Sequence, residues 1–206
     1  MNYFIVLIFV LCSYTIIEKL LRHFSIIKCK VQLWSTIWYY LWGSCLLLAV
    51  SIISPNDFVF KIPVDIRSII GVIIIMLLFI FASVKNNTSV YYPKASEPLK
   101  CIHHSIVLPI FEEVAFRGII LPILIILLDK YVTIEIVLLL NGLLFALFHR
   151  NYWSFTKEHF GMYIMFLLDG YLLSYVTYST QSILMSVFTH IMINGGITAY
   201  KNFFQK

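Results

Sequence analysis

The stretch SIIGVIIIMLLFIFASV, residues 68–84, contains no charged side chain and lies between Arg67 and Lys85. An α-helix rises 1.5 Å per residue, so a stretch of about 20 apolar residues crosses the hydrocarbon core of a bilayer. By this length criterion the chain contains seven apolar spans, at residues 2–17, 31–53, 68–84, 101–128, 134–153, 160–178 and 181–200. The sequence therefore predicts an all-α fold, a polytopic membrane helix bundle with about seven transmembrane helices.

The composition excludes the other broad classes of protein. Of the 206 residues, 61% are hydrophobic and only 12% are charged, about half the charged share usual in soluble domains. A soluble fold of this length could not bury so much apolar surface, and a disordered chain would contain far less of it. The 15 Lys and Arg residues are scattered rather than gathered on one face, so nucleic acid is not an expected partner. We expect one membrane domain over residues 1–206.

The fourth span, residues 101–128, is too long for one straight membrane helix. It contains Pro109 and Pro122, and a proline inside a helix removes a hydrogen bond and kinks or breaks it. We therefore expect a kink or a break there, and a break would add an eighth short segment.

The distribution of basic residues predicts the orientation in the cell membrane. If the N-terminus lies outside, eleven of the 15 Lys and Arg fall on the cytoplasmic side, while Lys61, Arg67 and Lys130 fall outside and Arg117 lies within a span. Cytoplasmic loops are enriched in Lys and Arg. The predicted multi-pass protein thus has its N-terminus outside and its C-terminus in the cytoplasm.

Charged residues within the fourth span are the first candidates for a functional site. Glu112, Glu113 and Arg117 lie between strongly apolar flanks, although a charge near the bilayer midplane costs from about 3 to more than 10 kcal/mol. Glu113 and Arg117 are four residues apart and can pair on one helix face. Such a pair does not account for Glu112, which projects about 100° away and is free to face a cavity.

Two further clusters contain histidine. Phe145 precedes His149 by four residues at the end of the fifth span, and His190 precedes Asn194 by four in the last span. A histidine near a membrane boundary is often merely interfacial, and a helix pair can be held by polar side chains. For Asp169, in the sixth span, we favour a hydrogen bond that packs helices over a place in the cavity. We expect His103 and His104 to be interfacial.

Depth in the membrane can be compared by counting residues. Glu112 lies about 17 Å from the inner face and His190 about 14 Å from the outer face, so their levels nearly coincide in a core of about 30 Å. By helix rise alone His149 lies about 8–10 Å too close to the cytoplasm, and helix tilt can close part of that gap. The expected site is an intramembrane cavity that opens to the cytoplasm.

A carboxylate, two imidazoles and an amide suit hydrolysis. A carboxylate can take a proton from water with help from a neighbouring histidine, and an imidazole and an amide can donate to an oxyanion. The same side chains, Glu112, His149 and His190, could instead hold zinc. The chain has no HExxH motif, and Arg117 would repel a cation. The residues leave metal-bound and metal-free activation of water open.

Together the three clusters resemble the motifs EExxxR, FxxxH and HxxxN of the CPBP family (CAAX proteases and bacteriocin-processing enzymes), also called the Abi family. The motifs occur in the family's order, each within a predicted span, and the resemblance covers roughly residues 100–200. It implies an intramembrane endopeptidase, a hydrolase that cleaves a small peptide or a membrane-associated protein. The implied catalytic residues are Glu112, His149, His190 and Asn194, supported by Glu113 and Arg117.

The resemblance leaves the cofactor and the biological role open. Members of the family have been regarded both as metalloproteases, for which zinc would be the cofactor, and as glutamate-dependent enzymes without a metal. Bacterial members are linked to the maturation of bacteriocins or peptide pheromones and to self-immunity. The alternative to a peptidase is a membrane protein that confers bacteriocin immunity by binding alone. A proton-coupled transporter is a third interpretation, and the lack of an inverted repeat argues against it.

Overall fold

The computed structural model describes residues 3–23, 40–46, 66–85, 93–149 and 157–204, and every regular element in these ranges is helical. The predicted all-α fold is confirmed for this part of the chain. The α-helices are α1 (Tyr3–His23), α3 (Ile66–Lys85), α4 (Pro98–Ile102), α5 (Leu108–Glu113), α6 (Leu121–Leu128), α7 (Ile134–Phe148), α8 (Lys157–Thr180) and α9 (Ile183–Phe204). Residues 40–46 are also helical, and the rest of the predicted span 31–53 lies outside the described residues.

The helix that contains the predicted fourth span runs without interruption from Pro98 to Leu128. Two segments within it are π-helical, η2 (His103–Val107) and η3 (Val114–Ile120). The N–H of Leu108 bonds to the carbonyl of His103 five residues back, and that of Leu121 bonds to Phe116 in the same way. Each of these two leucines directly precedes a proline. The wider turn accommodates the missing donor and the bulk of the proline ring. The helix is not broken, so no eighth segment arises here.

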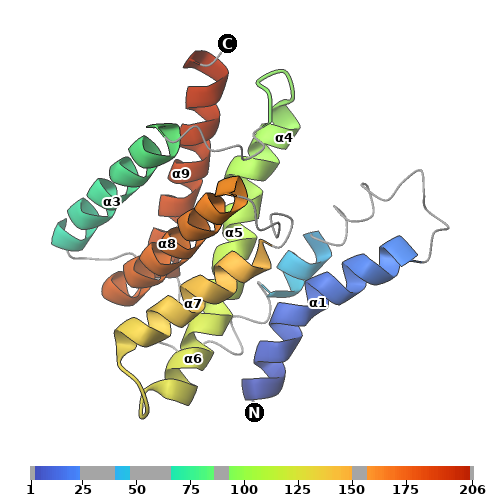
Figure 1. Cartoon of the computed structure of the whole chain (residues 1–206), viewed down its shortest axis with the longest axis vertical. Coiled ribbons are helices and arrows are strands. Elements are labelled where there is room, and N and C mark those ends of the chain that lie inside the picture. Colours follow the sequence, from blue (N-terminus) through green and yellow to red (C-terminus); the bar gives the residue numbers. More distant parts are fainter. Residues whose placement is uncertain (1–2, 24–39, 47–65, 86–92, 150–156, 205–206) are drawn as a thin grey trace.

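This long helix forms the centre of the bundle (Figure 1), and residues 114–121 are almost completely buried. On one side α1 packs against η3 and α6, and on the other α9 packs against α5 and η2. Helix α3 packs against α9, while α7 and α8 pack against each other and run obliquely to the central column. The charged residues of the fourth span thus lie at the centre of the fold.

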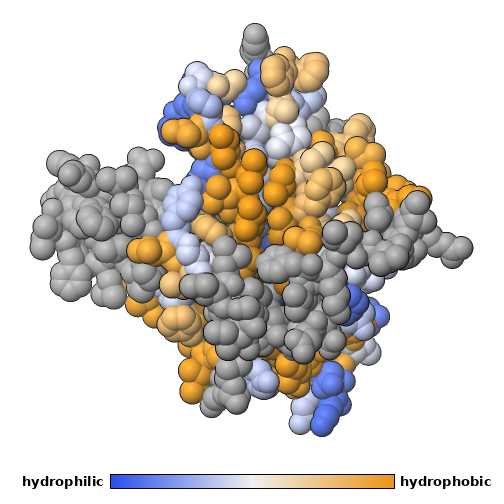
Figure 2. Space-filling view, turned by 180° about the vertical axis from the view of Figure 1, so that it is seen from behind, coloured by the Kyte–Doolittle hydropathy of each residue, from blue (hydrophilic) through white to orange (hydrophobic). Residues whose placement is uncertain are grey.

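The outer faces of the helices are apolar. Figure 2 shows hydrophobic side chains across the middle of one face of the molecule, with hydrophilic residues above and below them. The exposed apolar side chains on α1, α3 and α7 include Phe4, Ile8, Ile70, Ile74, Leu77, Phe81, Leu139 and Leu143. By length and composition, Phe160–Thr180 and Ile183–Phe204 can each cross a membrane. An apolar band between polar ends is the surface that a bilayer requires.

Hydrogen bonds show that the segment before α4 and the last turns of α9 lie at the same end of the bundle. The Asn202 side chain, near the end of α9, accepts a bond from the N–H of Ala95 (2.8 Å) and donates one to the carbonyl of Pro93 (3.1 Å). The segment before α4 therefore lies beside the C-terminal end of the chain, and Figure 1 shows the N-terminus at the opposite end. This arrangement agrees with the prediction that the two ends of the chain lie on opposite sides of the membrane. Which end faces the cytoplasm stays a prediction.

Two glycines allow α7 and α8 to touch through their backbones. A Cβ atom added at Gly142 would lie 2.7 Å from the backbone nitrogen of Tyr171 and 2.9 Å from the carbonyl of Leu167. A Cβ at Gly170 would lie 2.8 Å from Cα of Gly142. Small residues at a membrane helix interface permit this close approach.

Gly142→Ala is therefore expected to destabilise the protein by about 1–3 kcal/mol, because rigid backbone must move to admit the methyl group. Gly161→Ala, in α8, is the matched control, since no atom of the described residues lies within 4 Å of its added Cβ. The free energy of unfolding of both variants can be measured in detergent. Equal stability of the two variants would contradict the backbone contact.

Candidate active site

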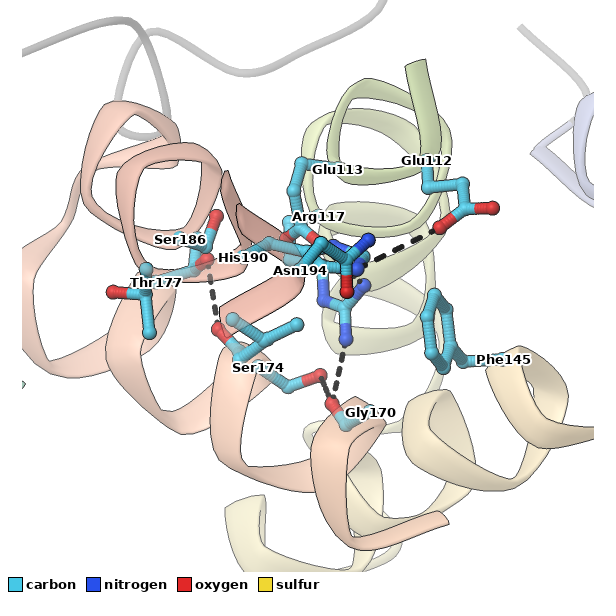
Figure 3. Close-up of polar contacts among 12 residues, drawn as sticks. Glu112, Glu113, Arg117, Phe145, Gly170, Ser174, Thr177, Ser186, His190 and Asn194 are labelled. Carbon is cyan, nitrogen blue, oxygen red and sulfur yellow. Dashed lines mark hydrogen bonds and ion pairs between the residues drawn. The ribbon is translucent and has the colours of Figure 1, made fainter. Parts of the chain in front are cut away.

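The predicted pair between Glu113 and Arg117 is present and completely buried. Nη1 of Arg117 donates to Oε1 of Glu113 (2.9 Å), and Nη2 donates to the carbonyl of Gly170 (2.8 Å) in α8. The guanidinium also lies over the Phe145 ring of α7, 4.7 Å from the ring centre, an attractive cation–π arrangement. One side chain therefore connects the central helix to both α7 and α8 (Figure 3).

His190 is oriented by the same carboxylate. Its Nδ1 lies 2.8 Å from Oε1 of Glu113. An ionised carboxylate only accepts hydrogen bonds, so Nδ1 carries a proton and donates it. The other ring nitrogen, Nε2, then faces Glu112 and lies 3.8 Å from its Oε2. Figure 3 shows His190 of α9 between the two glutamates of α5.

His149 faces Glu112 from the other side. The backbone N–H of His149 bonds to Ala146, in the tightened last turn of α7, while Nδ1 of the ring lies 2.9 Å from the carbonyl of Phe145. Because a carbonyl only accepts, Nδ1 is the donor, and Nε2 of the neutral ring has a lone pair. That Nε2 lies 4.0 Å from Oε1 of Glu112. The Phe166 ring stacks on the imidazole, with centres 4.1 Å apart and planes at 16°.

The expected depths of these residues are partly corrected by the fold. The levels of Glu112 and His190 coincide, as predicted. Helix rise alone leaves a gap of about 8–10 Å for His149, and the helix tilt that was expected to close part of it brings Nε2 of His149 to 4.0 Å from Oε1 of Glu112. Helix α7 is inclined to the central helix (Figure 1), and the incline places the end of α7 beside Glu112.

Asn194 lies one turn beyond His190 in α9, and its Nδ2 donates to the carbonyl of His104 (3.4 Å). In a regular α-helix that carbonyl would accept from the N–H of Leu108. In η2 Leu108 bonds to His103 instead, and Pro109 has no N–H to offer. The π segment thus frees a carbonyl, and because a carbonyl selects the donor end of an amide, it fixes the orientation of Asn194.

The geometry does not favour the alternative zinc site. Within the described ranges, no three His, Cys, Asp or Glu side chains are arranged to hold a metal ion. The bond from Nδ1 of His190 to Glu113 does not bear on this point, because histidines that bind zinc usually donate their other ring N–H to a carboxylate. The described side chains are therefore not arranged as a zinc site.

Two contributors to the site, Phe166 and Gly170, were not predicted, and for Asp169 a place in the cavity was the less favoured alternative. Asp169 is 7% exposed and interacts electrostatically with His190, Arg117 and Glu113. Its Oδ1 has no hydrogen-bond partner in the described part of the chain, so the helix-packing bond expected of it is not made by that atom. Phe166 and the carbonyl of Gly170 had no signal in the sequence. The charge of Asp169 inside a span was the one available signal.

A comparison with protein families identifies the chain more directly. The model of the family described as Type II CAAX prenyl endopeptidase Rce1-like matches residues 94–196, half of the chain. The matched range contains all three motifs and confirms the resemblance drawn from them. No curated protein and no solved structure matched the sequence. The chain belongs to the Rce1-like family of type II CAAX prenyl endopeptidases, which are membrane-embedded proteases.

Proposed function

We propose that this protein is a glutamate-dependent intramembrane endopeptidase, in which Glu112 and His149 activate water while His190 and Asn194 stabilise an oxyanion. The observation that carries the proposal is the position of Glu112 between the Nε2 atoms of two histidines, at 3.8 and 4.0 Å. These separations are too long for direct hydrogen bonds and suit a single bridging water molecule.

In the proposed reaction a water oxygen attacks the carbonyl carbon of the scissile peptide bond. Glu112 takes one proton of the water, and the lone pair on Nε2 of His149 accepts a hydrogen bond from the other. The tetrahedral intermediate then collapses as the carbon–nitrogen bond breaks. Glu112 returns its proton to the departing amine, which leaves a new carboxyl end and a new amino end.

The negative charge that develops on the carbonyl oxygen requires donors. Nδ1 of His190 already donates to Glu113, so Nε2 can donate to the oxyanion only when the ring is an imidazolium. Asn194 uses one amide hydrogen on His104 and has a second to offer. Preorganised donors of this kind contribute about 3–4 kcal/mol each to lowering a barrier. Glu113 and Arg117 hold His190 in place and do not touch the substrate.

Removal of metal ions is expected to leave the activity unchanged, because the proposed reaction uses only side chains. The test is cleavage of a peptide library by the purified protein in detergent, with and without a strong chelator, read by mass spectrometry. Products formed equally in both samples are expected. Loss of cleavage with chelator and its return with added zinc would contradict the metal-free reaction.

The same test addresses the proposed substrates, which are small peptides or peptide segments of membrane-associated proteins. Maturation or self-immunity involving bacteriocins is one proposed role.

Glu112→Gln expressed in cells distinguishes the peptidase from a protein that confers immunity by binding alone. Only the binding protein would still protect the cells from the bacteriocin after this change. We further propose that the site opens to the cytoplasm, where the basic residue distribution places the C-terminus.

A further inference from the structure

Asp169 is a buried carboxylate that the proposed reaction does not use. It lies in α8, where its Oδ1 is inaccessible and has no hydrogen-bond partner among the described residues. An ionisable side chain within the membrane is costly and ordinarily serves a site. A buried oxygen without a partner adds a further cost. The position of this residue therefore requires an explanation.

The two contacts that α8 makes with the site lie on either side of Asp169. Phe166, one turn earlier, stacks on the ring of His149. Gly170, the next residue, accepts the hydrogen bond from Arg117. Asp169 also interacts electrostatically with Glu112 and His190. The contacts of these two neighbours place Asp169 beside the candidate active site.

The charges at this site do not balance once Asp169 is included. Among the described residues the site has three carboxylates, those of Glu112, Glu113 and Asp169, and one permanent cation, Arg117. The guanidinium is bound to Glu113. His190, when it carries a positive charge, lies against Glu112. The carboxyl group of Asp169 is then the one acidic group of the site, among the described residues, that makes no ion pair of its own.

Exposure also distinguishes the carboxylate of Glu113 from those of Glu112 and Asp169. Glu113 and its partner Arg117 are 0% exposed, whereas Glu112 is 8% and Asp169 is 7% exposed. Of the two carboxylates that retain some access, one is the proposed base. The other, Asp169, is exposed to a similar small extent.

We propose that Asp169 binds a positively charged side chain of the substrate, lysine or arginine, close to the scissile bond. This inference rests on the proposed peptidase function. A cationic side chain would balance the negative charge of this carboxyl group, and the interaction is strong because the site is largely screened from water. Asp169 would then determine specificity and take no part in the bond cleavage.

The experiment uses the full-length protein in detergent and N-acetylated peptides in which each position in turn is lysine or norleucine, a neutral residue of similar length. Cleavage and equilibrium binding are measured in parallel for the wild type, Asp169→Asn and the control Asp129→Asn at the exposed end of α6. For the wild type and the control we expect a preference of at least about tenfold for lysine at one position. In Asp169→Asn this preference should vanish, because cleavage of the lysine peptide should fall at least about tenfold more than cleavage of the norleucine peptide.

The other outcomes overturn the proposal or separate it from the function on which it rests. A wild type without any preference for lysine, or an equal loss of both peptides in a folded Asp169→Asn protein, would overturn it. If the wild type cleaves nothing yet binds the lysine peptide more tightly, and Asp169→Asn does not, then the peptidase function fails and the cation site stands. Thermal unfolding of each variant establishes that it is folded.

Discussion

Replacing Glu112 with glutamine should lower kcat for peptide cleavage by about 10²- to 10⁴-fold, the usual contribution of a positioned general base. The amide has nearly the same shape but cannot take a proton from water. Substrate contacts elsewhere in the site are unchanged, so KM should change little. The measurement is steady-state cleavage by the purified variant beside the wild type.

The matched control is Glu135→Gln, the same change at an exposed position of α7. It should leave kcat within about twofold of the wild type, as is usual for surface changes. Thermal unfolding of Glu112→Gln should resemble that of the wild type, because the nearest histidine nitrogens among the described residues lie 3.8 and 4.0 Å from the carboxylate, too far for a direct hydrogen bond. Activity of Glu112→Gln close to that of the control would remove Glu112 from the proposed reaction.

Replacing Arg117 with methionine should destabilise the protein by about 3–5 kcal/mol, the usual cost of removing one partner of a buried ion pair. The change leaves the carboxylate of Glu113 at membrane depth without its cation, and it also removes the donor to the carbonyl of Gly170. It should further release His190 from its fixed orientation. The free energy of unfolding in detergent measures the first effect directly.

The double variant Glu113→Gln/Arg117→Met tests the stated cause. Because it removes both charges, it should recover part of the stability lost in Arg117→Met. Activity should not return, since a glutamine cannot keep Nδ1 of His190 as a donor to a charged acceptor. A double variant less stable than Arg117→Met would show that the buried charge of Glu113 is not the source of the loss.

Local spacing was sufficient to predict the pairs within one helix. Glu113 and Arg117 share a helix face at i,i+4, as do His190 and Asn194, and both follow from helix periodicity alone. The apolar runs predicted the all-α fold for the same reason, since only helices of that length satisfy their backbone in lipid.

Contacts between helices could not be predicted in this way. The position of His149 depends on the incline of α7, which is set by the backbone contact between Gly142 and Gly170. The carbonyl that orients Asn194 becomes available only because η2 shifts the hydrogen bonding before Pro109. Neither effect can be inferred from the helical repeat of the sequence. A proline in a helix predicts a disturbance but does not distinguish a break from a π turn.

The most direct test of the account is to incubate the purified protein with the peptide library in water enriched in ¹⁸O. The proposed reaction predicts products from the wild type that carry ¹⁸O in a new C-terminal carboxyl group. It predicts essentially no such products from Glu112→Gln. Labelled products formed equally by both proteins, or none from a folded wild type, would contradict hydrolysis by water activated at Glu112.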